Sequence, residues 1–426
     1  MMTIEFPYAD YEPLKIASQH EARVFTLPDY RPQVVGREAV RAALQAPIGS
    51  ARLAELARGK RRVLIVVDDV SRPTPVADFV DLVLHELHSA GVEDARIEFL
   101  AALGTHRTMT RSELKAKLGD AVVGHYAVHN HEWANANGLE YIGDSDQGVP
   151  VWVNRRLRDA ELVVGLGAIM PLEVSGFTGG GKILVPGVCG EETVDQMHWK
   201  RIDLATHEIL GKADNPVRRS IDSLARKAGL HFIVNVILNA ENQIVSAVAG
   251  DMCDAHRAGC EVARQVFGVR VPKEYDIVVA DAHPFDIEFW QANKALDTAG
   301  LVVRPGGVVI LATPCYEGFS RTHAEDIRKH GYPQIGKIKQ LVDSGQIRHK
   351  VVGVHMFQVS SVVAEKARLI LVATGISQQE AESVGLQWAE TAQQAFSRAE
   401  EVTGPSASVA VLHDAARMLA LVEGKG

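Results

Sequence analysis

Short apolar runs alternate with amphipathic stretches along most of the chain. A fully apolar run of strand length, followed by a helix-length stretch with one polar face, is typical of parallel sheets covered by helices. Buried strands are expected at residues 62–67, 96–102, 161–165, 231–238, 275–280, 307–312 and 368–373, and helices at 76–90 and 254–267. The pattern predicts an α/β protein with mostly parallel sheets flanked by helices.

The chain is longer than a single hydrophobic core usually serves, so two α/β domains are expected, with the active site in the cleft between them. The segment GVRVPKE at 268–274 joins a predicted helix to a fresh strand. We therefore predict an N-terminal α/β domain over 1–270 and a C-terminal α/β domain over 271–400. Residues 401–426 are expected to add a strand and a helix that pack back on the N-terminal domain.

Composition narrows the class of partner. The 426 residues carry 45 Lys and Arg against 53 Asp and Glu, a formal net charge of −8. Because the basic residues form no stripe, the sequence argues against nucleic acid as a partner. There is no signal-peptide pattern and no apolar run of membrane-spanning length, and the four cysteines show no CxxC spacing. A cytoplasmic protein with no membrane partner is expected.

The most informative stretch is 175–200, SGFTGGGKILVPGVCGEETVDQMHWK. Residues 176–182 fit G-x-x-x-x-G-K, the body of a phosphate-binding P-loop. Ile183 argues against that interpretation, because a P-loop needs Ser or Thr there to hold magnesium. Two interpretations remain open on this segment alone: a flexible glycine loop with a solvated Lys182, or a backbone that closely approaches a nucleotide-like cofactor beside that lysine.

Several separated motifs resemble the nickel-dependent lactate racemases. The family has a Gly-Phe-Ser-Gly-Gly loop, then a lysine, Pro-Gly and a histidine, as at Gly176-Phe177-Thr178-Gly179-Gly180, Lys182, Pro186-Gly187 and His198 here. Further matching segments are 47–60, Asp69-x-x-Arg72-Pro73, 104–107, 249–252 and 291–294. The motifs occur in the family's order and extend over most of the chain, so we identify the sequence as resembling a divergent member of that family.

The resemblance implies a 2-hydroxyacid racemase or epimerase whose cofactor is a nickel-pincer nucleotide made by separate cofactor-synthesis proteins. In that chemistry a hydride leaves the substrate, a 2-keto acid forms, and the hydride returns on either face. Lys182 is the implied cofactor anchor, beside Gly179, Gly180 and Gly181, and His198 is the implied nickel ligand. Neutral imidazole suits nickel, and the protein supplies binding, orientation and charge around the cofactor.

The resemblance also implies that the domain over 1–270 binds the cofactor and that the domain over 271–400 forms the substrate pocket. The substrate side of the site follows from the same motifs. His106, in a loop after a predicted strand, is expected to be the base for the substrate hydroxyl, and Asp69 its acidic partner or that of Arg72. Arg72 can bind a carboxylate through two parallel hydrogen bonds, while Lys294 and Gln291 add charge and a hydrogen bond. The neighbouring Asp68 is interpreted as a solvated residue or strand cap.

One departure from the family concerns the second catalytic histidine, because Leu172 stands at its position. Leucine exchanges no proton, so symmetrical two-histidine racemisation of lactate is in question. Possible replacements are Glu173, if burial raises its pKa, and the histidines at 129, 131 and 283. Which residue replaces it stays open.

A second departure lies in the C-terminal half, where the family's tryptophan is not evident and 354–358 (VHMFQ) stands instead. Together with Trp290, this difference predicts a substrate other than lactate, a larger or polyhydroxylated acid such as a sugar acid. Two alternatives to a racemase are kept: a redox enzyme using the same cofactor for net hydride transfer, and a non-catalytic cofactor-binding homologue.

Overall fold

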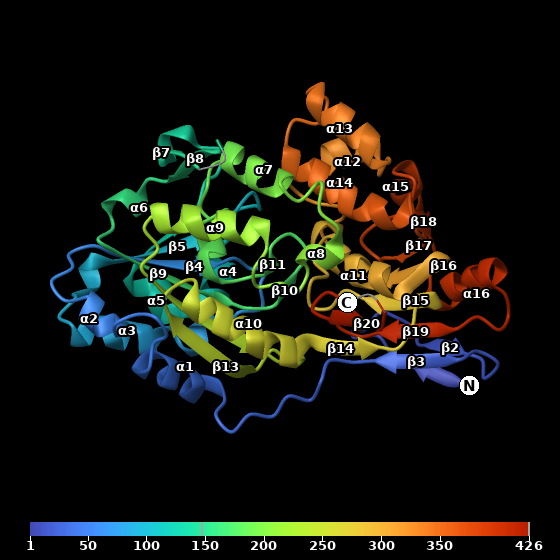
Figure 1. Cartoon of the computed structure of the whole chain (residues 1–426), viewed down its shortest axis with the longest axis horizontal. Coiled ribbons are helices and arrows are strands. Elements are labelled where there is room, and N and C mark those ends of the chain that lie inside the picture. The colour runs from blue at the N-terminus through green and yellow to red at the C-terminus, as the bar shows by residue number, and fades with distance from the viewer. Residues whose placement is uncertain (146–147, 425–426) are drawn as a thin grey trace. The chain divides into compact units, whose positions relative to one another are not determined.

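The computed structural model describes residues 1–145 and 148–424, and the chain forms two compact units (Figure 1). We name each after its central strand. The β4 unit, around β4 (Val63–Asp68), comprises residues 29–201 and 208–266. The β15 unit, around β15 (Tyr275–Asp281), comprises residues 1–28, 202–207 and 267–426. Each unit has its own sheet.

The β4 unit is built on a six-stranded sheet of order β13-β12-β9-β4-β5-β6, parallel except for β13. Nearly every residue of the inner strands is apolar and buried, as expected for a sheet covered on both faces. The remaining strands are β5 (Ile97–Ala102), β6 (Ala127–Asn130), β9 (Leu162–Ala168), β12 (Phe232–Leu238) and β13 (Ile244–Gly250), with two small hairpins, β7 (Leu139–Asp144) with β8 (Pro150–Asn154) and β10 (Pro171–Leu172) with β11 (Gly176–Phe177).

Local signals explain where several helices of the β4 unit begin. Thr110 and Glu113 form a capping box at the start of α4 (Arg111–Leu118), and Asn215 caps α9 (Pro216–Lys227), whose first residue is a proline. The other helical elements are α1 (Gly36–Gln45), α2 (Leu53–Leu56), η1 (Val76–Asp78), α3 (Val80–Ser89), η2 (Asp94–Arg96), α5 (Asp120–His125), η3 (Ala136–Gly138), α6 (Arg156–Asp159), η4 (Gly180–Ile183), α7 (Glu191–Trp199), α8 (Thr206–Ile209, which begins in residues of the β15 unit) and α10 (Asp254–Phe267).

The β15 unit has an all-parallel sheet of order β18-β17-β16-β15-β19-β3. Its other strands are β3 (Ala22–Phe25), β16 (Val303–Ala312), β17 (Arg368–Val372), β18 (Gln387–Trp388) and β19 (Val409–Leu412), with the pairs β1 (Met2–Ile4) and β2 (Leu14–Ile16), and β14 (Gly268–Val271) and β20 (Leu419–Val422). Its helices are α11 (Phe289–Val302), α12 (Ala324–His330), α13 (Ile335–Asp343), α14 (Lys350–Val363), α15 (Gln378–Ser383) and α16 (Ala392–Thr403). The predicted fold class is confirmed.

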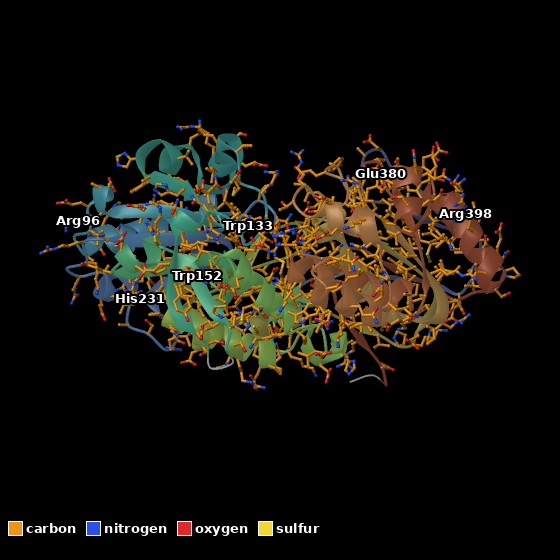
Figure 2. All side chains as sticks on the ribbon, turned by 90° about the horizontal axis from the view of Figure 1, so that it is seen from above. Arg96, Trp133, Trp152, His231, Glu380 and Arg398 are labelled. Atoms are coloured by element: carbon orange, nitrogen blue, oxygen red, sulfur yellow. The ribbon has the colours of Figure 1, made fainter. Side chains whose placement is uncertain are left out.

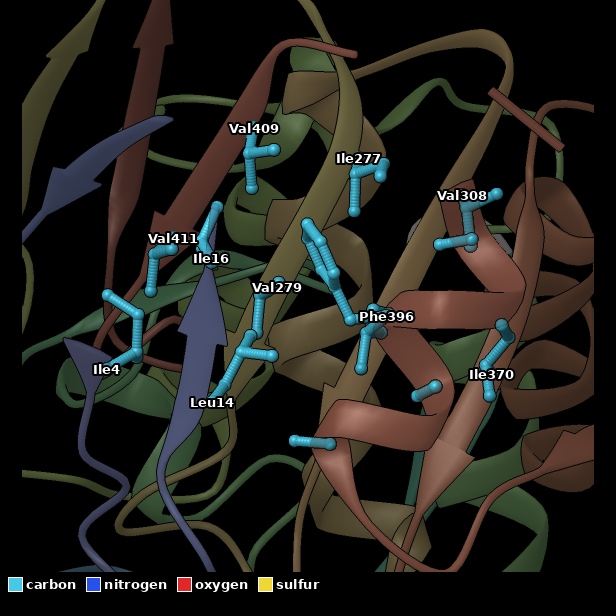
Figure 3. Packing of buried hydrophobic residues seen from close by; sticks show 14 of the residues in the cluster. Ile4, Leu14, Ile16, Ile277, Val279, Val308, Ile370, Phe396, Val409 and Val411 are labelled. Atoms are coloured by element: carbon cyan, nitrogen blue, oxygen red, sulfur yellow. The ribbon is translucent and has the colours of Figure 1, made fainter. Parts of the chain in front are cut away.

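Figure 3 shows the core on one face of this sheet. Alternate residues of β15, β16, β17 and β19, such as Ile277 and Val308, pack against Phe396 of α16. Ile4, from β1, joins the same cluster together with residues of β2. The period-2 alternation of strands explains why one set of residues builds this core while their neighbours face the other side of the sheet.

The two units divide the chain differently from the expected ranges. The expected boundary near 270 lies close to the observed one, but residues 1–28 belong to the β15 unit because β3 pairs with β19. Within 401–426, β19 inserts between β15 and β3, and β20 pairs with β14, so this segment completes the β15 unit and forms two strands instead of a strand and a helix. Residues 425–426 lie outside the described part of the chain.

Charged side chains lie on the outside of both units, as Arg96 and Glu380 illustrate (Figure 2). Among the described residues, we find no helix with the length and apolar character needed to cross a membrane.

Candidate active site in the β4 unit

Three neighbouring parallel strands bring the predicted residues of the β4 unit together. β9, β4 and β5 are adjacent in the sheet, so their carboxyl ends share one edge. Asp69 and Arg72 follow β4, His106 follows β5, and the glycine-rich segment with Lys182 follows β9. This edge is where open α/β sheets hold their ligands.

His106 and Asp69 form a tight pair. His106 Nδ1 lies 2.5 Å from Asp69 Oδ2, with the carboxylate almost fully buried and the imidazole one-quarter exposed. Burial alone would raise the pKa of Asp69, but the charge and hydrogen bond of His106, together with Arg72 and Ser71, outweigh it and hold the pKa well below its usual range. The ionised carboxylate accepts a hydrogen bond from Nδ1–H, and in a neutral imidazole with that tautomer the lone pair lies on Nε2.

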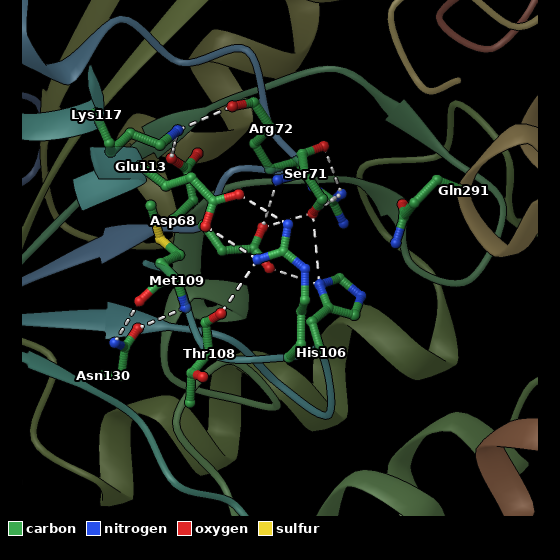
Figure 4. Close-up of polar contacts among 12 residues, drawn as sticks. Asp68, Ser71, Arg72, His106, Thr108, Met109, Glu113, Lys117, Asn130 and Gln291 are labelled. Carbon is green, nitrogen blue, oxygen red and sulfur yellow. Dashed lines mark hydrogen bonds and ion pairs between the residues drawn. The ribbon is translucent and has the colours of Figure 1, made fainter. Parts of the chain in front are cut away.

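The other carboxylate oxygen of Asp69 organises the loop that carries Arg72. Asp69 Oδ1 accepts hydrogen bonds from the Ser71 amide at 3.1 Å and the Ser71 hydroxyl at 2.5 Å. Arg72 Nη1 donates to Ser71 Oγ at 2.9 Å and to the Ser71 carbonyl at 3.1 Å. Figure 4 shows Ser71 between Arg72 and His106. Asp69 therefore orients both the imidazole and, through Ser71, the guanidinium, which covers both roles foreseen for it.

Ser71 is a residue that motif reasoning passed over. Its hydroxyl also lies 3.4 Å from His106 Nδ1, so Ser71 contacts Asp69 and Arg72 of its own loop and His106 of the loop after β5. The local signal was present, because a serine two residues after an aspartate is well placed to form a side-chain turn with it.

Asp68 differs from its expected role. Its carboxylate is mostly buried and pairs at 2.8 Å with Lys117 Nζ, and Thr74 Oγ1 donates to its other oxygen at 2.5 Å. Burial raises the pKa of Asp68, and the charge of Lys117 opposes that shift. Asp68 is thus an internal anchor and not a solvated neighbour.

The glycine-rich segment is fixed to the body of the unit. The Thr178 amide donates to the Met170 carbonyl at 2.9 Å, and the Thr178 hydroxyl donates to the Ala168 carbonyl at the end of β9 at 2.6 Å. The buried guanidinium of Arg218 donates to the carbonyls of Phe177 and Gly179, and the Gly180 amide donates to Asn235 Oδ1 at 2.8 Å. The alternative of a flexible loop is therefore wrong for the described structure.

Close packing explains the run of glycines. A Cβ on Gly179 would lie 2.7 Å from Asn235 Oδ1, one on Gly180 2.8 Å from His256 Cγ, and one on Gly181 2.9 Å from Ala225 Cβ. Gly179 and Gly180 also have positive φ angles, which favour glycine. The absence of side chains at these glycines lets the segment pack against neighbouring residues of the same unit. Any contribution of the three glycines to cofactor binding would therefore come from their backbone groups.

Lys182 lies half-buried in η4, immediately after the glycines. The following chain returns to the His106 loop, because the Gly104 amide donates to the Gly187 carbonyl at 2.9 Å while Gly187 donates to the Lys182 carbonyl at 3.3 Å. The positions of Lys182 and of the loop that begins at Leu103 are thereby coupled through backbone hydrogen bonds.

His198, near the end of α7, has the surroundings of a neutral imidazole. Its Nδ1 donates to the Val194 carbonyl at 2.8 Å, which leaves the lone pair on Nε2, an arrangement common among metal-ligating histidines. Burial first, then the charges of Lys182 and His106, lower its pKa to about 4. The donor set of this unit therefore fits a nickel-containing cofactor anchored on a lysine.

The predicted residues Gln291 and Lys294 belong to α11 of the β15 unit. Lys294 Nζ lies 2.5 Å from Gln291 Oε1 and 5.1 Å from the centre of the Phe285 ring, and both α11 residues are buried. In the same unit Trp290 stacks on His355, with ring centres 4.4 Å apart. Burial, followed by the charges of His323 and Lys294, lowers the pKa of His355 to about 3.

The candidates for a second base have different surroundings. Leu172 is buried in β10. His131 is fully buried with both ring nitrogens engaged, Nε2 with the Cys189 carbonyl and Nδ1 with the Asn154 amide. His129 pairs with Glu98 at 3.4 Å, and in the β15 unit His283 lies 3.5 Å from Asp286. The contacts of His131 argue against it as a proton carrier.

Glu173, beside Leu172, is also buried. Its carbonyl accepts a hydrogen bond from Arg201 Nε at 2.9 Å, and Arg201 is itself almost fully buried. This hydrogen bond fixes the backbone at Glu173.

Comparison with known proteins extends these observations to the whole chain. Residues 9–208 match the lactate racemase N-terminal domain and residues 271–420 the lactate racemase C-terminal domain. The lactate racemase of Thermoanaerobacterium thermosaccharolyticum is 32% identical over 334 residues, 75% of this chain and 76% of that protein. That of Lactiplantibacillus plantarum is 29% identical over 316 residues, 74% of this chain and 73% of that protein.

Solved structures agree. The lactate racemase apoprotein from Thermoanaerobacterium thermosaccharolyticum has a TM-score of 0.87 and 25% identity, covering 99% of this chain and 100% of that chain. A Thermotoga maritima protein has a TM-score of 0.73 at 21% identity, covering 92% and 100%, and shows the fold alone. The fold and the matching domains define an isomerase. The chain belongs to the lactate racemase family, which confirms the resemblance found in the sequence.

Proposed function

We propose that this protein is a nickel-pincer-dependent racemase or epimerase of a 2-hydroxy acid. The observation that carries the proposal is the arrangement of the His106–Asp69 pair, Arg72 and Lys182 after neighbouring strands of the β4 sheet, with His198 on α7 of the same unit. A carrier that only bound the cofactor would need neither a paired base nor a guanidinium beside it, so the arrangement favours catalysis over the non-catalytic alternative.

Lys182 and His198 would hold the cofactor, the first by its side-chain nitrogen and the second through Nε2 on nickel. Backbone groups of Gly179, Gly180 and Gly181 would border it. When bound, the group supplies a reversible acceptor for the hydrogen on carbon 2 of the substrate. Separate cofactor-synthesis proteins are expected partners, and the four free cysteines suit the reducing cytoplasm.

The protein's own residues would handle the carboxylate and the proton. Arg72 binds the substrate carboxylate, and Gln291 and Lys294 are proposed to contribute a hydrogen bond and charge to substrate binding. Nε2 of His106 takes the hydroxyl proton as carbon 2 loses its hydrogen, and the ionised Asp69 stabilises the resulting imidazolium. The same proton returns to the oxygen when the 2-keto intermediate is reduced.

The proposed substrate is larger than lactate or polyhydroxylated, such as a sugar acid. Support comes from Leu172, which cannot act as a base, and from the Trp290–His355 stack in the β15 unit. A redox enzyme using the same cofactor for net hydride transfer is the second candidate, because an apolar Leu172 leaves proton exchange at that position without a group to carry it.

Protein matured with the cofactor-synthesis proteins should interconvert both stereoisomers of at least one 2-hydroxy acid. His106→Ala is expected to lower that rate by about 10²- to 10⁴-fold, the range for loss of a general base. Chiral chromatography of a panel that includes sugar acids measures both directions. His85→Ala, at an exposed position of α3, is the matched control. Accumulation of keto acid without inverted product would support the redox enzyme instead.

A further inference from the structure

Helix α4 lies beside both loops that carry the proposed substrate-handling residues. Glu113 and Lys117 are four residues apart on this helix, so their side chains emerge from the same face. Each side chain contacts a different loop: Lys117 the loop after β4, and Glu113 the loop after β5. Sequence motifs gave no role to either residue.

Lys117 is the more deeply buried contact, with a side chain only 5% exposed. Its ammonium group donates to Asp68 Oδ1 at 2.8 Å, to the Arg72 carbonyl at 2.8 Å and to the Thr74 carbonyl at 3.2 Å. An ammonium has three protons, so these bonds use its whole donor capacity. They fix the loop on both sides of Arg72, as Figure 4 shows for Arg72 and Asp68.

Glu113 makes the corresponding contacts with the His106 loop. Its carboxylate accepts two parallel hydrogen bonds from Arg107, at 2.7 Å and 2.9 Å, and also closes the capping box with Thr110. The hydrogen bond of Arg107, which outweighs partial burial, lowers the pKa of Glu113 to about 2. Asn130 fixes the far end of this loop through two hydrogen bonds to the backbone of Met109.

Burying an ammonium group is costly, and an apolar side chain could fill the same volume without that cost. The charged groups instead determine the positions of two loops, because their directional hydrogen bonds fix both loops to one rigid helix. The 2.5 Å contact between Asp69 and His106 joins residues from those two loops, so it depends on both being held.

We propose that α4 is a brace that fixes the position of the loop of Asp69 and Arg72 relative to the loop of His106. Lys117 and Glu113 are its positioning residues. The inference rests on the proposed function, because the relative position of the two loops matters for catalysis only if His106 and Arg72 act on one substrate. Neither residue needs to touch the substrate.

The first test is hydrogen exchange of backbone amides in protein without cofactor. Lys117→Met should speed exchange at 69–74 by at least about tenfold and leave 103–109 near wild type. Glu113→Gln, which keeps the capping ability of residue 113, should do the reverse. Lys115→Met, an exposed lysine of the same helix that pairs with Asp120, is the control and should change neither loop.

Because Lys117→Met leaves Asp68 buried without its cation, the variant could fail to fold. The double variant Asp68→Asn with Lys117→Met removes both charges and should still free 69–74, since the bonds to the Arg72 and Thr74 carbonyls remain lost. The proposed bracing role of α4 would be overturned if, in this double variant, amide exchange at 69–74 is unchanged. It would also be overturned if exchange is accelerated throughout the β4 unit.

The second test uses matured enzyme. Both single variants should lower kcat about tenfold or more with a smaller change in KM, because a displaced base and clamp affect the transition state more than the first encounter. Local loosening with wild-type kcat would refute a positioning role. If wild-type protein racemises no 2-hydroxy acid, the proposed function fails, and the exchange experiment still decides whether α4 holds the two loops.

Discussion

His198→Ala protein, matured with the cofactor-synthesis proteins and then desalted, should contain almost no nickel. In the proposed site the variant would remove the histidine that holds nickel, and the alanine methyl offers no lone pair in its place. Metal analysis per protein chain measures the loss directly, and wild-type protein is expected to retain close to one nickel.

His207→Ala is the matched control, since His207 is an exposed histidine a short distance along the chain and should leave the nickel content unchanged. Peptide mass analysis should find the cofactor on Lys182 in wild type. Full nickel retention in His198→Ala would contradict the ligand role, and an unmodified Lys182 in nickel-containing wild type would show non-covalent attachment.

Arg72→Ala should lower kcat/KM by a factor that corresponds to about 2–5 kcal/mol, the scale for leaving a desolvated charge without its partner. The guanidinium is held by Ser71, which is itself fixed by Asp69, so the proposed carboxylate clamp would be preorganised. Steady-state kinetics with the 2-hydroxy acid identified by the stereoisomer panel measures this change in kcat/KM.

Arg58→Ala, at an exposed arginine of the same unit, should behave as wild type. Arg72→Lys separates charge from geometry, because lysine keeps the charge but cannot form two parallel hydrogen bonds, and it should recover only part of the loss. Activity of Arg72→Ala within about twofold of wild type, well under 1 kcal/mol, would exclude Arg72 from substrate binding.

The strands of both sheets could be predicted where the sequence carries long apolar runs. The runs at 62–67, 96–102 and 275–280 correspond to β4, β5 and β15 within a residue at each end. The short strands β3 and β19 gave a weaker signal, and their pairing joins residues 22–25 to 409–412. A local sequence pattern does not indicate which distant strand a short strand will pair with. For this reason residues 1–28 were assigned to the N-terminal domain and residues 401–426 were expected to pack on it, whereas the structure places both segments in the β15 unit.

In the candidate site too, some residues could be predicted from the sequence, whereas contacts between residues distant in the sequence could not. Asp69, Arg72 and His106 could be found because they lie in motifs that resemble the family's and follow predicted strands. The structure pairs Asp69 with His106 and links Asp69 to Arg72 through Ser71. The reason for glycine at 179–181 could not be found, because the atoms that exclude a side chain belong to Asn235, His256 and Ala225, distant in sequence. The pairing of Asp68 with Lys117 was hidden for the same reason.

The most direct test of the proposed function is the fate of a deuterium placed on carbon 2 of one pure stereoisomer. If the hydrogen leaves as a hydride and the same hydrogen returns, the inverted product should keep its deuterium while the reaction runs in ordinary water. Mass spectrometry of chirally separated product gives the retained fraction. Retention in most inverted molecules is the predicted result; loss of the label to solvent, or labelled substrate converted to keto acid with no inverted product, would contradict it.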